Sequence, residues 1–278
     1  MNSLLTNPHQ ILVVDDHPVN QMVLTAMLAE LNFGAETANS GIEAVQMIAE
    51  QNFDLIFMDL QMPVMDGYET ARQIRKHPNH RQTPIIAITA STIDGQITRQ
   101  CQGLMDELLG KPFESVDLEK LLTRWLVKVT AIEPLDCFNP SNNGAQAEPN
   151  LLNLSNLTAL DRDSIDRLQA TFSGAEQSSL LELLEVFLDT FEMLYQQLGK
   201  NLLSGDLGAI RQTAHALKSS SGNVGALRFM SISSDIEQLT QLEQTDPIGA
   251  MAKPWSQIQQ EYRLLLPDLA DLIAQLKK

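Results

Sequence analysis

The sequence contains few cysteine residues. Cys101 and Cys137 are the two cysteines among 278 residues, too few for a disulfide framework or a zinc site built from thiolates. Dense disulfide bonding is typical of small secreted proteins rather than of proteins in the reducing cytosol. We therefore expect two reduced thiols.

Long apolar runs are also missing. A helix that spans a bilayer needs about 18 or more consecutive apolar residues, and no stretch of the sequence approaches this length. Residues 1–10 lack the basic segment and the apolar run of a secretory signal peptide. The sequence therefore predicts a cytoplasmic protein that does not insert into a membrane.

Clusters of Lys and Arg are absent, and acidic residues dominate. The formal net charge is −16, with 35 Asp and Glu against 19 Lys and Arg. A nucleic-acid-binding surface must meet the phosphate backbone with grouped basic side chains, so we expect no nucleic-acid partner. With 44% hydrophobic and 19% charged residues, the composition is that of an ordinary globular protein, and the length suits two domains.

Short apolar runs alternate with helical patterns in residues 9–128. Several runs are apolar on both faces, which is typical of strands in a parallel sheet that helices cover on both sides. The pattern predicts a doubly wound α/β domain with about five strands. The strands are expected at 11–14, 35–38, 54–58, 84–88 and 107–109. Helices are expected after the first strand and at 41–50, 67–76, 93–103 and 114–127.

The pattern changes after residue 128. Residues 129–157 contain three prolines and a polar run, and we expect a flexible linker there. Residues 158–278 have no strand signal and are predicted to form an antiparallel four-helix bundle, so the chain is α/β followed by all-α. The helical patterns lie at about 162–171, 178–203, 206–221, 226–243 and 255–277.

Polar side chains follow the expected strands where each strand ends. Asp15 and Asp16 follow the first strand, and Asp59, Thr89 and Lys111 stand at the ends of later ones. Ligands of open parallel sheets bind outside the carboxyl ends of the strands, so these side chains should converge. Singly, each would also suit a structural position. Together, three carboxylates call for a cation, and oxygen ligands suit Mg²⁺, with the Lys and Thr as partners for a phosphoryl group.

One of the five histidines, His215, has distinctive helical neighbours. It falls about 120° from the centre of the apolar stripe of its helix, on the flank expected to be exposed. Lys218, Ser219 and Gly222 share its face. An exposed helical His often has no function, but here another protein could approach the ring closely. A neutral imidazole nitrogen is nucleophilic near physiological pH, and the ammonium could neutralise a phosphoryl group bound to it.

Residues 9–128 resemble a response-regulator receiver domain, which has a flavodoxin-like fold. The resemblance covers essentially the whole first domain, and its central run is typical of receivers that belong to or serve hybrid histidine kinases. It rests on Asp15-Asp16, the run MDLQMPVMDG at residues 58–67, Thr89-Ala90 and Lys111-Pro112-Phe113.

The resemblance implies a role for each polar residue at the ends of the expected strands. Asp59 would accept a phosphoryl group from the phosphohistidine of an upstream histidine kinase. Lys111 would stabilise the phosphoryl oxygens, and Thr89 would hydrogen-bond the bound group. Four groups would hold Mg²⁺, namely the carboxylates of Asp15, Asp16 and Asp59 and the backbone carbonyl of Gln61.

The first domain departs from the family pattern at one position and from an enzyme family at another. Receivers that drive an output usually have an aromatic residue three positions before the Lys, where this chain has Leu108. This difference favours a domain that passes phosphate on. Phosphohydrolases with an aspartyl nucleophile usually have an acid two residues after it, where Gln61 stands, so we do not expect an enzyme of that class.

Residues 158–278 resemble a histidine phosphotransfer (Hpt) domain. The resemblance rests on His215-Ala-Leu-Lys218 and Gly225-Ala226, supported by Leu160-Asp161 and Gly205-Asp206. It implies that His215 carries the phosphoryl group, with Lys218, Ser219 and Gly222 as its neighbours. One departure is Ser219, where the family commonly has glycine.

The two resemblances together predict a phosphorelay protein that is phosphorylated on Asp59 and His215 and has no kinase ATP-binding domain. Its expected partners are an upstream histidine kinase and the receiver domain of another response regulator. The linker is long enough for the two domains of one chain to meet. The alternatives are the receiver and Hpt portion of a hybrid histidine kinase, and a binding module in which His215 is unused.

Overall fold

The first domain of the computed structural model is built on a parallel sheet. The structure describes residues 9–89, 95–111, 113–126, 154, 157–172, 178–242 and 246–277. The strand order is β2-β1-β3-β4-β5, and all neighbours are parallel. Strands β1, β3 and β4 are buried along their whole length, as apolar runs on both faces require. The strands are Ile11–Val14, Ala35–Ala38, Leu55–Asp59, Ile85–Thr89 and Glu107–Gly110.

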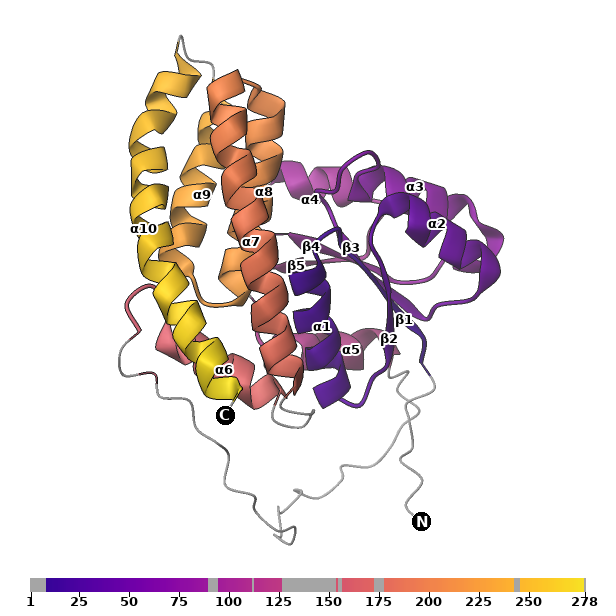
Figure 1. The fold of residues 1–278 in the computed structure, drawn as a ribbon. Coiled ribbons are helices and arrows are strands. Elements are labelled where there is room, and N and C mark those ends of the chain that lie inside the picture. Colours follow the sequence, from indigo (N-terminus) through magenta and orange to yellow (C-terminus); the bar gives the residue numbers. More distant parts are fainter. Residues whose placement is uncertain are drawn as a thin grey trace, which may run out of the picture.

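Helices cover both faces of this sheet (Figure 1). Helices α1 and α5 pack against one face, in a core that includes Val13 and Phe57. Helices α2, α3 and α4 cover the other face, where their core includes Leu12 and Ile56. The doubly wound prediction is therefore confirmed. The five helices are Pro18–Glu30, Gly41–Glu50, Gly67–Lys76, Gly95–Cys101 and Ser115–Leu126, with a short 3₁₀ turn, η1, at Pro78–His80.

The second domain is helical, and α7, α8, α9 and α10 form the expected antiparallel bundle, with α6 beside its lower end (Figure 1). The turn between α8 and α9 contains Gly225 at φ 76°, where a Cβ would also collide with Ser164. The helices α6 to α10 are Arg162–Phe172, Ser178–Ser204, Leu207–Asn223, Leu227–Leu239 and Pro247–Leu276.

The last helix begins earlier than its pattern predicts. We expected a start near residue 255. Pro254, just before it, lacks the N–H that a helix interior needs. In the structure α10 begins at Pro247, and Pro254 lies inside it. Asp246 caps this end by accepting a hydrogen bond from the backbone N–H of Gly249 at 2.8 Å. A strong cap and a proline in the first turn thus outweigh the internal proline.

The two domains pack against each other through α1, which contacts α6, α7 and α8. One apolar cluster runs from the α1 and α5 face of the sheet into the helical bundle, and Val23 and Met27 of α1 belong to it. Two residues of the predicted linker, Leu154 and Leu157, are described, and both pack against this cluster. The remaining linker residues, 129–153, 155 and 156, lie outside the described residues.

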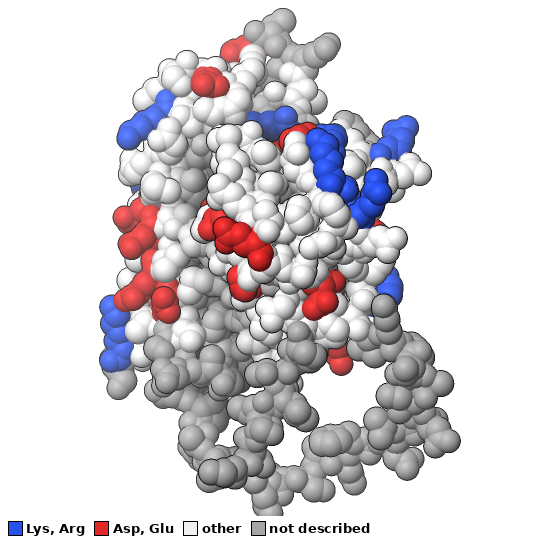
Figure 2. Space-filling view, turned by 90° about the vertical axis from the view of Figure 1, so that its right-hand side faces the viewer, with Lys and Arg blue, Asp and Glu red and all other residues white. Residues whose placement is uncertain are grey.

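One face of the molecule shows how acidic and basic side chains are distributed (Figure 2). On the face seen in Figure 2 these groups lie among uncharged residues, and the described part of that face has no continuous basic stripe. None of the described helices is both long and apolar enough to cross a membrane.

Candidate functional site

The carboxyl ends of the strands meet at one edge of the sheet and bring the predicted polar side chains together. Asp15 directly follows β1, Asp59 ends β3, Thr89 ends β4 and Lys111 follows β5. Asp15 and Asp59 are each 4% exposed, and Thr89 is 2% exposed. The sequence order of polar residues after strands was therefore a sound guide to their position in space.

Lys111 joins the two buried carboxylates. Its Nζ lies 2.9 Å from Oδ2 of Asp15 and 2.9 Å from Oδ2 of Asp59. Burial alone would lower the pKa of Lys111, but the two carboxylates outweigh it and raise the pKa above its ordinary value. The ammonium is therefore charged and partly neutralises both acids.

The two carboxylates respond differently to this shared cation. Burial would raise the pKa of Asp59, but Lys111 and the His215 ring outweigh it and lower the pKa to about 2. Burial and the charge of Asp59 raise the pKa of Asp15 to about 6, against the effect of Lys111. Asp59 is thus an ionised, desolvated carboxylate at neutral pH, as a nucleophile requires.

His17, which sequence reasoning did not assign to the site, lies beside Asp15 and Asp16. Its Nδ1 lies 2.9 Å from Oδ1 of Asp16, and its backbone N–H donates to Oδ1 of Asp15 at 2.9 Å. One ligand atom from each of these three residues lies within 4.8 Å of the others. Burial would lower the pKa of His17, but the bond to Asp16 and the surrounding carboxylates raise it. The position of His17 directly after two aspartates was the sequence feature that could have predicted this contact.

The loop after β3 holds Asp59 from its other side. The backbone N–H of Gln61 donates to Oδ1 of Asp59 at 2.8 Å. Further along the loop, a Cβ at Gly67 would collide with the backbone of Asp59 and Leu60, so only glycine lets α3 start this close to the strand end. Leu108, the departure from the family pattern, packs against the apolar cluster on the α2 to α4 face.

His215 lies on α8 and is buried, which corrects the expectation of an exposed ring. It is 5% exposed, and its Nδ1 lies 2.9 Å from Oε1 of Glu237 on α9. The helical wheel places His215 away from the centre of the apolar stripe, but it cannot show the neighbouring helix or the α/β domain. Both reduce the exposure of the ring.

Glu237 is a site residue that sequence reasoning missed. It is 3% exposed and also accepts a hydrogen bond from Nζ of Lys218 to its Oε2 at 3.0 Å. Burial would raise the pKa of Glu237, but His215 and Lys218 outweigh it and lower the pKa. The sequence feature that could have predicted this role was an acidic residue next to Ile236, on the buried face of α9.

The other predicted neighbours of His215 have separate contacts. Ser219 faces the α/β domain, where its Oγ lies 3.3 Å from Nζ of Lys111. Gly222 packs against Met230 of α9, so its small size serves the close approach of the two helices. Lys218 reaches His215 through Glu237, as described above.

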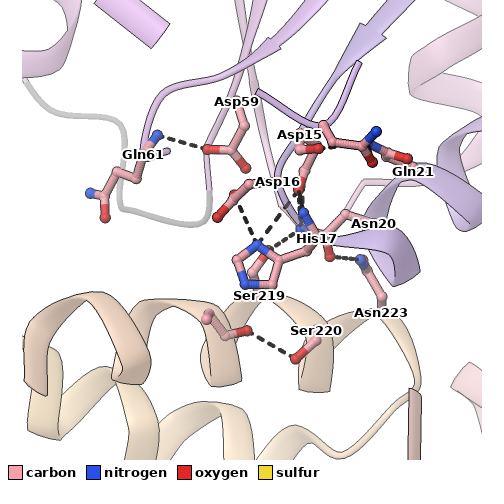
Figure 3. Close-up of polar contacts among 12 residues, drawn as sticks. Asp15, Asp16, His17, Asn20, Gln21, Asp59, Gln61, Ser219, Ser220 and Asn223 are labelled. Atoms are coloured by element: carbon pink, nitrogen blue, oxygen red, sulfur yellow. Dashed lines mark hydrogen bonds and ion pairs between the residues drawn. The ribbon is translucent and has the colours of Figure 1, made fainter. Parts of the chain in front are cut away.

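The edge of the sheet that carries Asp15, Asp16 and Asp59 is called the acidic edge below. It faces α8 across a cleft of about 810 Å³. Asp16, Gln61 and Thr89 line it from the α/β domain, and His215 and Lys218 line it from the bundle. Figure 3 shows the aspartates and His17 above α8, with Ser219 directed toward them. His215 is near enough to Asp59 to lower its pKa. Polar groups of both domains, including the imidazole of His215, therefore line one partly enclosed space beside the receiver carboxylates.

Two family models match the sequence. The response regulator receiver domain matches residues 11–123, and the Hpt domain matches residues 182–278. The first match contains the five strands that the structure describes and the aspartates that follow them, and the second contains His215 and Glu237.

Similar proteins include sensor kinases much longer than this chain. The signal transduction histidine-protein kinases BarA of Shigella flexneri and Escherichia coli K12 are 29% identical over 229 residues, which is 82% of this chain and 23% of each relative. The sensor histidine kinase RcsC of Escherichia coli K12 is 34% identical over 119 residues, 43% of this chain and 12% of RcsC. The chain thus spans less than a quarter of the length of these relatives.

One similar solved structure is the receiver domain of the sensor histidine kinase PA1611 from Pseudomonas aeruginosa PAO1, crystallised with a magnesium ion in its active-site cleft. It is 40% identical to this chain, with a TM-score of 0.41, and the match covers 44% of this chain and 99% of that domain.

Proposed function

Because the chain joins a response regulator receiver domain to an Hpt domain, we propose that it relays a phosphoryl group between Asp59 and His215. Receiver and Hpt domains are modules of phosphotransfer signalling. A histidine kinase supplies the phosphoryl group, and the receiver domain of another response regulator exchanges it with His215. The protein itself needs no ATP-binding domain for this work and acts in the cytoplasm, where kinases draw on ATP.

The observation that carries this proposal is the cleft that Thr89, Gln61 and His215 line together, beside a buried Asp59 carboxylate whose pKa is about 2. An ionised Asp59 can attack phosphorus without a general base. Lys111, which is held between the carboxylates, offsets negative charge on the reacting groups. The proposed domain limits are 9–128 and 158–278, with 129–157 as the linker.

The acidic edge also suits a divalent cation. Carboxylate oxygens of Asp15 and Asp16 lie close together, and they form a donor set that suits Mg²⁺, with Asp59 and the backbone carbonyl of Gln61 as further ligands. When bound, Mg²⁺ would offset the negative charge of the phosphoryl oxygens. His17 offers nitrogen, which Mg²⁺ disfavours, and it bonds to Asp16 instead.

His215 is arranged to react through Nε2. In the tautomer with a proton on Nδ1, the Nδ1–H group donates a hydrogen bond to the Glu237 carboxylate, and Nε2 carries the lone pair that reacts. When Nε2 attacks the phosphorus of phospho-Asp59, the bond from phosphorus to the Asp59 oxygen breaks and the carboxylate leaves. The ring then holds phosphate on Nε2 and a proton on Nδ1, and Glu237 stabilises its positive charge. The reverse reaction uses the same contacts.

A phosphotransfer time course tests the proposal. Full-length wild type, Asp59→Asn and His215→Gln are incubated with radiolabelled acetyl phosphate and Mg²⁺. Wild type should acquire both base-labile acyl phosphate and acid-labile phosphohistidine. The His215→Gln chain should carry only the acyl phosphate, and the Asp59→Asn chain neither form. Equal acid-labile label on wild type and the Asp59→Asn chain would contradict a relay through Asp59.

Mixing the two variants distinguishes transfer within one chain from transfer between chains. Label that reaches the Asp59→Asn chain from the His215→Gln chain must cross between molecules, and its rate should rise with protein concentration. Transfer in wild type should be independent of concentration, because both sites are in one molecule. A wild-type rate that rises in proportion to concentration would contradict transfer within the chain.

Glu237 is expected to set the rate of transfer at His215. In Glu237→Gln, the side chain keeps its shape but loses the charge that stabilises the phosphorylated ring, so the transfer rate should fall about tenfold. The rate from phospho-Asp59 to His215 is followed in single-turnover experiments. The matched control is Glu185→Gln, because Glu185 forms an exposed ion pair with Lys277. A fall of the same size in the control would contradict a role for Glu237.

A further inference from the structure

The two domains meet along α1, the helix that begins just after the receiver aspartates. Apolar side chains of α1 pack against the bundle, while an exposed ion pair, Arg167 with Glu114 at 3.1 Å, lies at the edge. Apolar packing favours association but fixes orientation poorly, and an exposed ion pair contributes little. The buried polar contacts at the N-terminal end of α1 are better suited to fix how the domains align.

Asn20 is the centre of these contacts. Its Nδ2 donates to both carboxylate oxygens of Asp15, at 2.9 and 3.0 Å, and lies 3.0 Å from Oγ of Ser219 on α8. Its Oδ1 accepts a hydrogen bond from Nδ2 of Asn223 at 2.7 Å. Asn20 is 4% exposed, so its amide is satisfied by groups from both domains at once.

Ser219 makes a second link to the receiver site. Its Oγ also accepts a hydrogen bond from Nζ of Lys111 at 3.3 Å, and Ser219 is 4% exposed. One hydroxyl on α8 therefore contacts the amide that orients Asp15 and the ammonium that joins Asp15 to Asp59. A glycine at this position would leave both donors without this acceptor.

We propose that Asn20, Ser219 and Asn223 form a clamp that docks the chain's own receiver domain onto its Hpt domain in the orientation needed for transfer. This inference rests on the proposed relay. A receiver without an amide at the position of Asn20 would leave the half-buried Asn223 amide without this acceptor and the buried Ser219 hydroxyl with Lys111 alone. The loss of such hydrogen bonds opposes binding. The partner that the surface of α8 fits is therefore the receiver of the same chain.

The clamp has a consequence for other partners. His215 is 5% exposed while the domains are docked, and the receiver lines the cleft in front of it. A separate receiver must reach the same side of α8, so it competes with the chain's own receiver for access to His215.

The test uses the full chain and variants on the Hpt side of the clamp. Ser219→Ala, Asn223→Ala and the double variant remove polar atoms whose described hydrogen bonds go to receiver residues. Ser220→Ala is the matched control, because the Ser220 hydroxyl donates to the carbonyl of Ala216 within α8 at 2.9 Å. Far-UV circular dichroism checks that each variant keeps its helices.

Two measurements follow, one of which needs no phosphate. Small-angle X-ray scattering of the unphosphorylated chain should give a larger radius of gyration for the double variant than for wild type and the control. Transfer from phospho-Asp59 to His215 should slow about tenfold in each single variant and further in the double variant.

The outcomes separate this inference from the relay itself. If wild type never labels His215 but the double variant still expands, the relay fails and the clamp remains a docking device. If the double variant is as compact as wild type and transfers as fast, the clamp is overturned while the relay stands. An equal expansion in Ser220→Ala would also overturn it, because the hydrogen bonds that the structure describes for that hydroxyl lie within α8.

Discussion

Lys111→Met is expected to reduce the phosphorylation of Asp59 by about 100-fold or more. The variant keeps the length of the side chain but removes the ammonium that lies 2.9 Å from both Asp15 and Asp59. Two charges about 4 Å apart interact by about 4 kcal/mol at an effective dielectric constant of about 20. Since about 1.4 kcal/mol changes a rate tenfold, even part of this loss accounts for the expected effect.

The same variant should change the pH dependence. Lys111 is the first of the groups that lower the pKa of Asp59 to about 2 against the effect of burial. Without it the pKa of Asp59 rises, so the carboxylate becomes protonated at higher pH. The acid limb of the phosphorylation rate should therefore move upward in pH relative to wild type.

Initial rates of labelling with acetyl phosphate between pH 4 and pH 8 would measure both effects. The matched control is Lys120→Met, because Lys120 is exposed and pairs with Asp117 at 4.0 Å. The control should follow wild type at every pH. If Lys111→Met had the same acid limb as wild type, Lys111 would not be the group that keeps Asp59 ionised.

Asp268→Ala should destabilise the Hpt domain by about 3 kcal/mol. Asp268 lies inside α10 and is 6% exposed. Its Oδ2 accepts hydrogen bonds from the backbone N–H groups of Thr158 and Ala159, each at 2.7 Å, and of Leu160 at 3.3 Å. Removal of the carboxylate leaves buried donors without an acceptor, and it frees the segment that leads into α6.

Urea unfolding followed by circular dichroism would measure the loss of stability. Asp271→Ala is the control on the same helix, because Asp271 is exposed and bonds to Gln275 within α10. Asp268→Asn should give an intermediate loss, since its amide oxygen can still accept hydrogen bonds but carries no charge. Equal midpoints for Asp268→Ala and Asp271→Ala would show that this anchor contributes little.

The sequence was informative wherever function depends on the order of elements along the chain. Strands that are apolar on both faces predicted the sheet, and the polar residues that follow them predicted where Asp15, Asp59 and Lys111 would meet. This works because parallel strands bring all their carboxyl ends to one edge. The boundary of α10 was predicted less well, since a local cap at Asp246 outweighed Pro254.

Contacts between elements that are distant in sequence could not be predicted. The burial of His215 depends on Glu237, which lies on another helix, and on a domain that precedes it in the chain. The bond of Ser219 to Lys111 spans 108 positions, and no periodicity links such a pair. The roles assigned to the site residues remain predictions that the experiments above can test.

Helix α1 lies between two partners, the sheet of its own domain and the helical bundle. Its residues Val19, Val23, Leu24, Met27 and Leu28 are all buried, which is the pattern of an internal helix rather than of one that faces solvent. In evolutionary terms, its outer face is constrained like a protein core. A substitution there must suit the Hpt surface as well as the receiver, so the two domains of this chain should diverge together rather than as interchangeable parts.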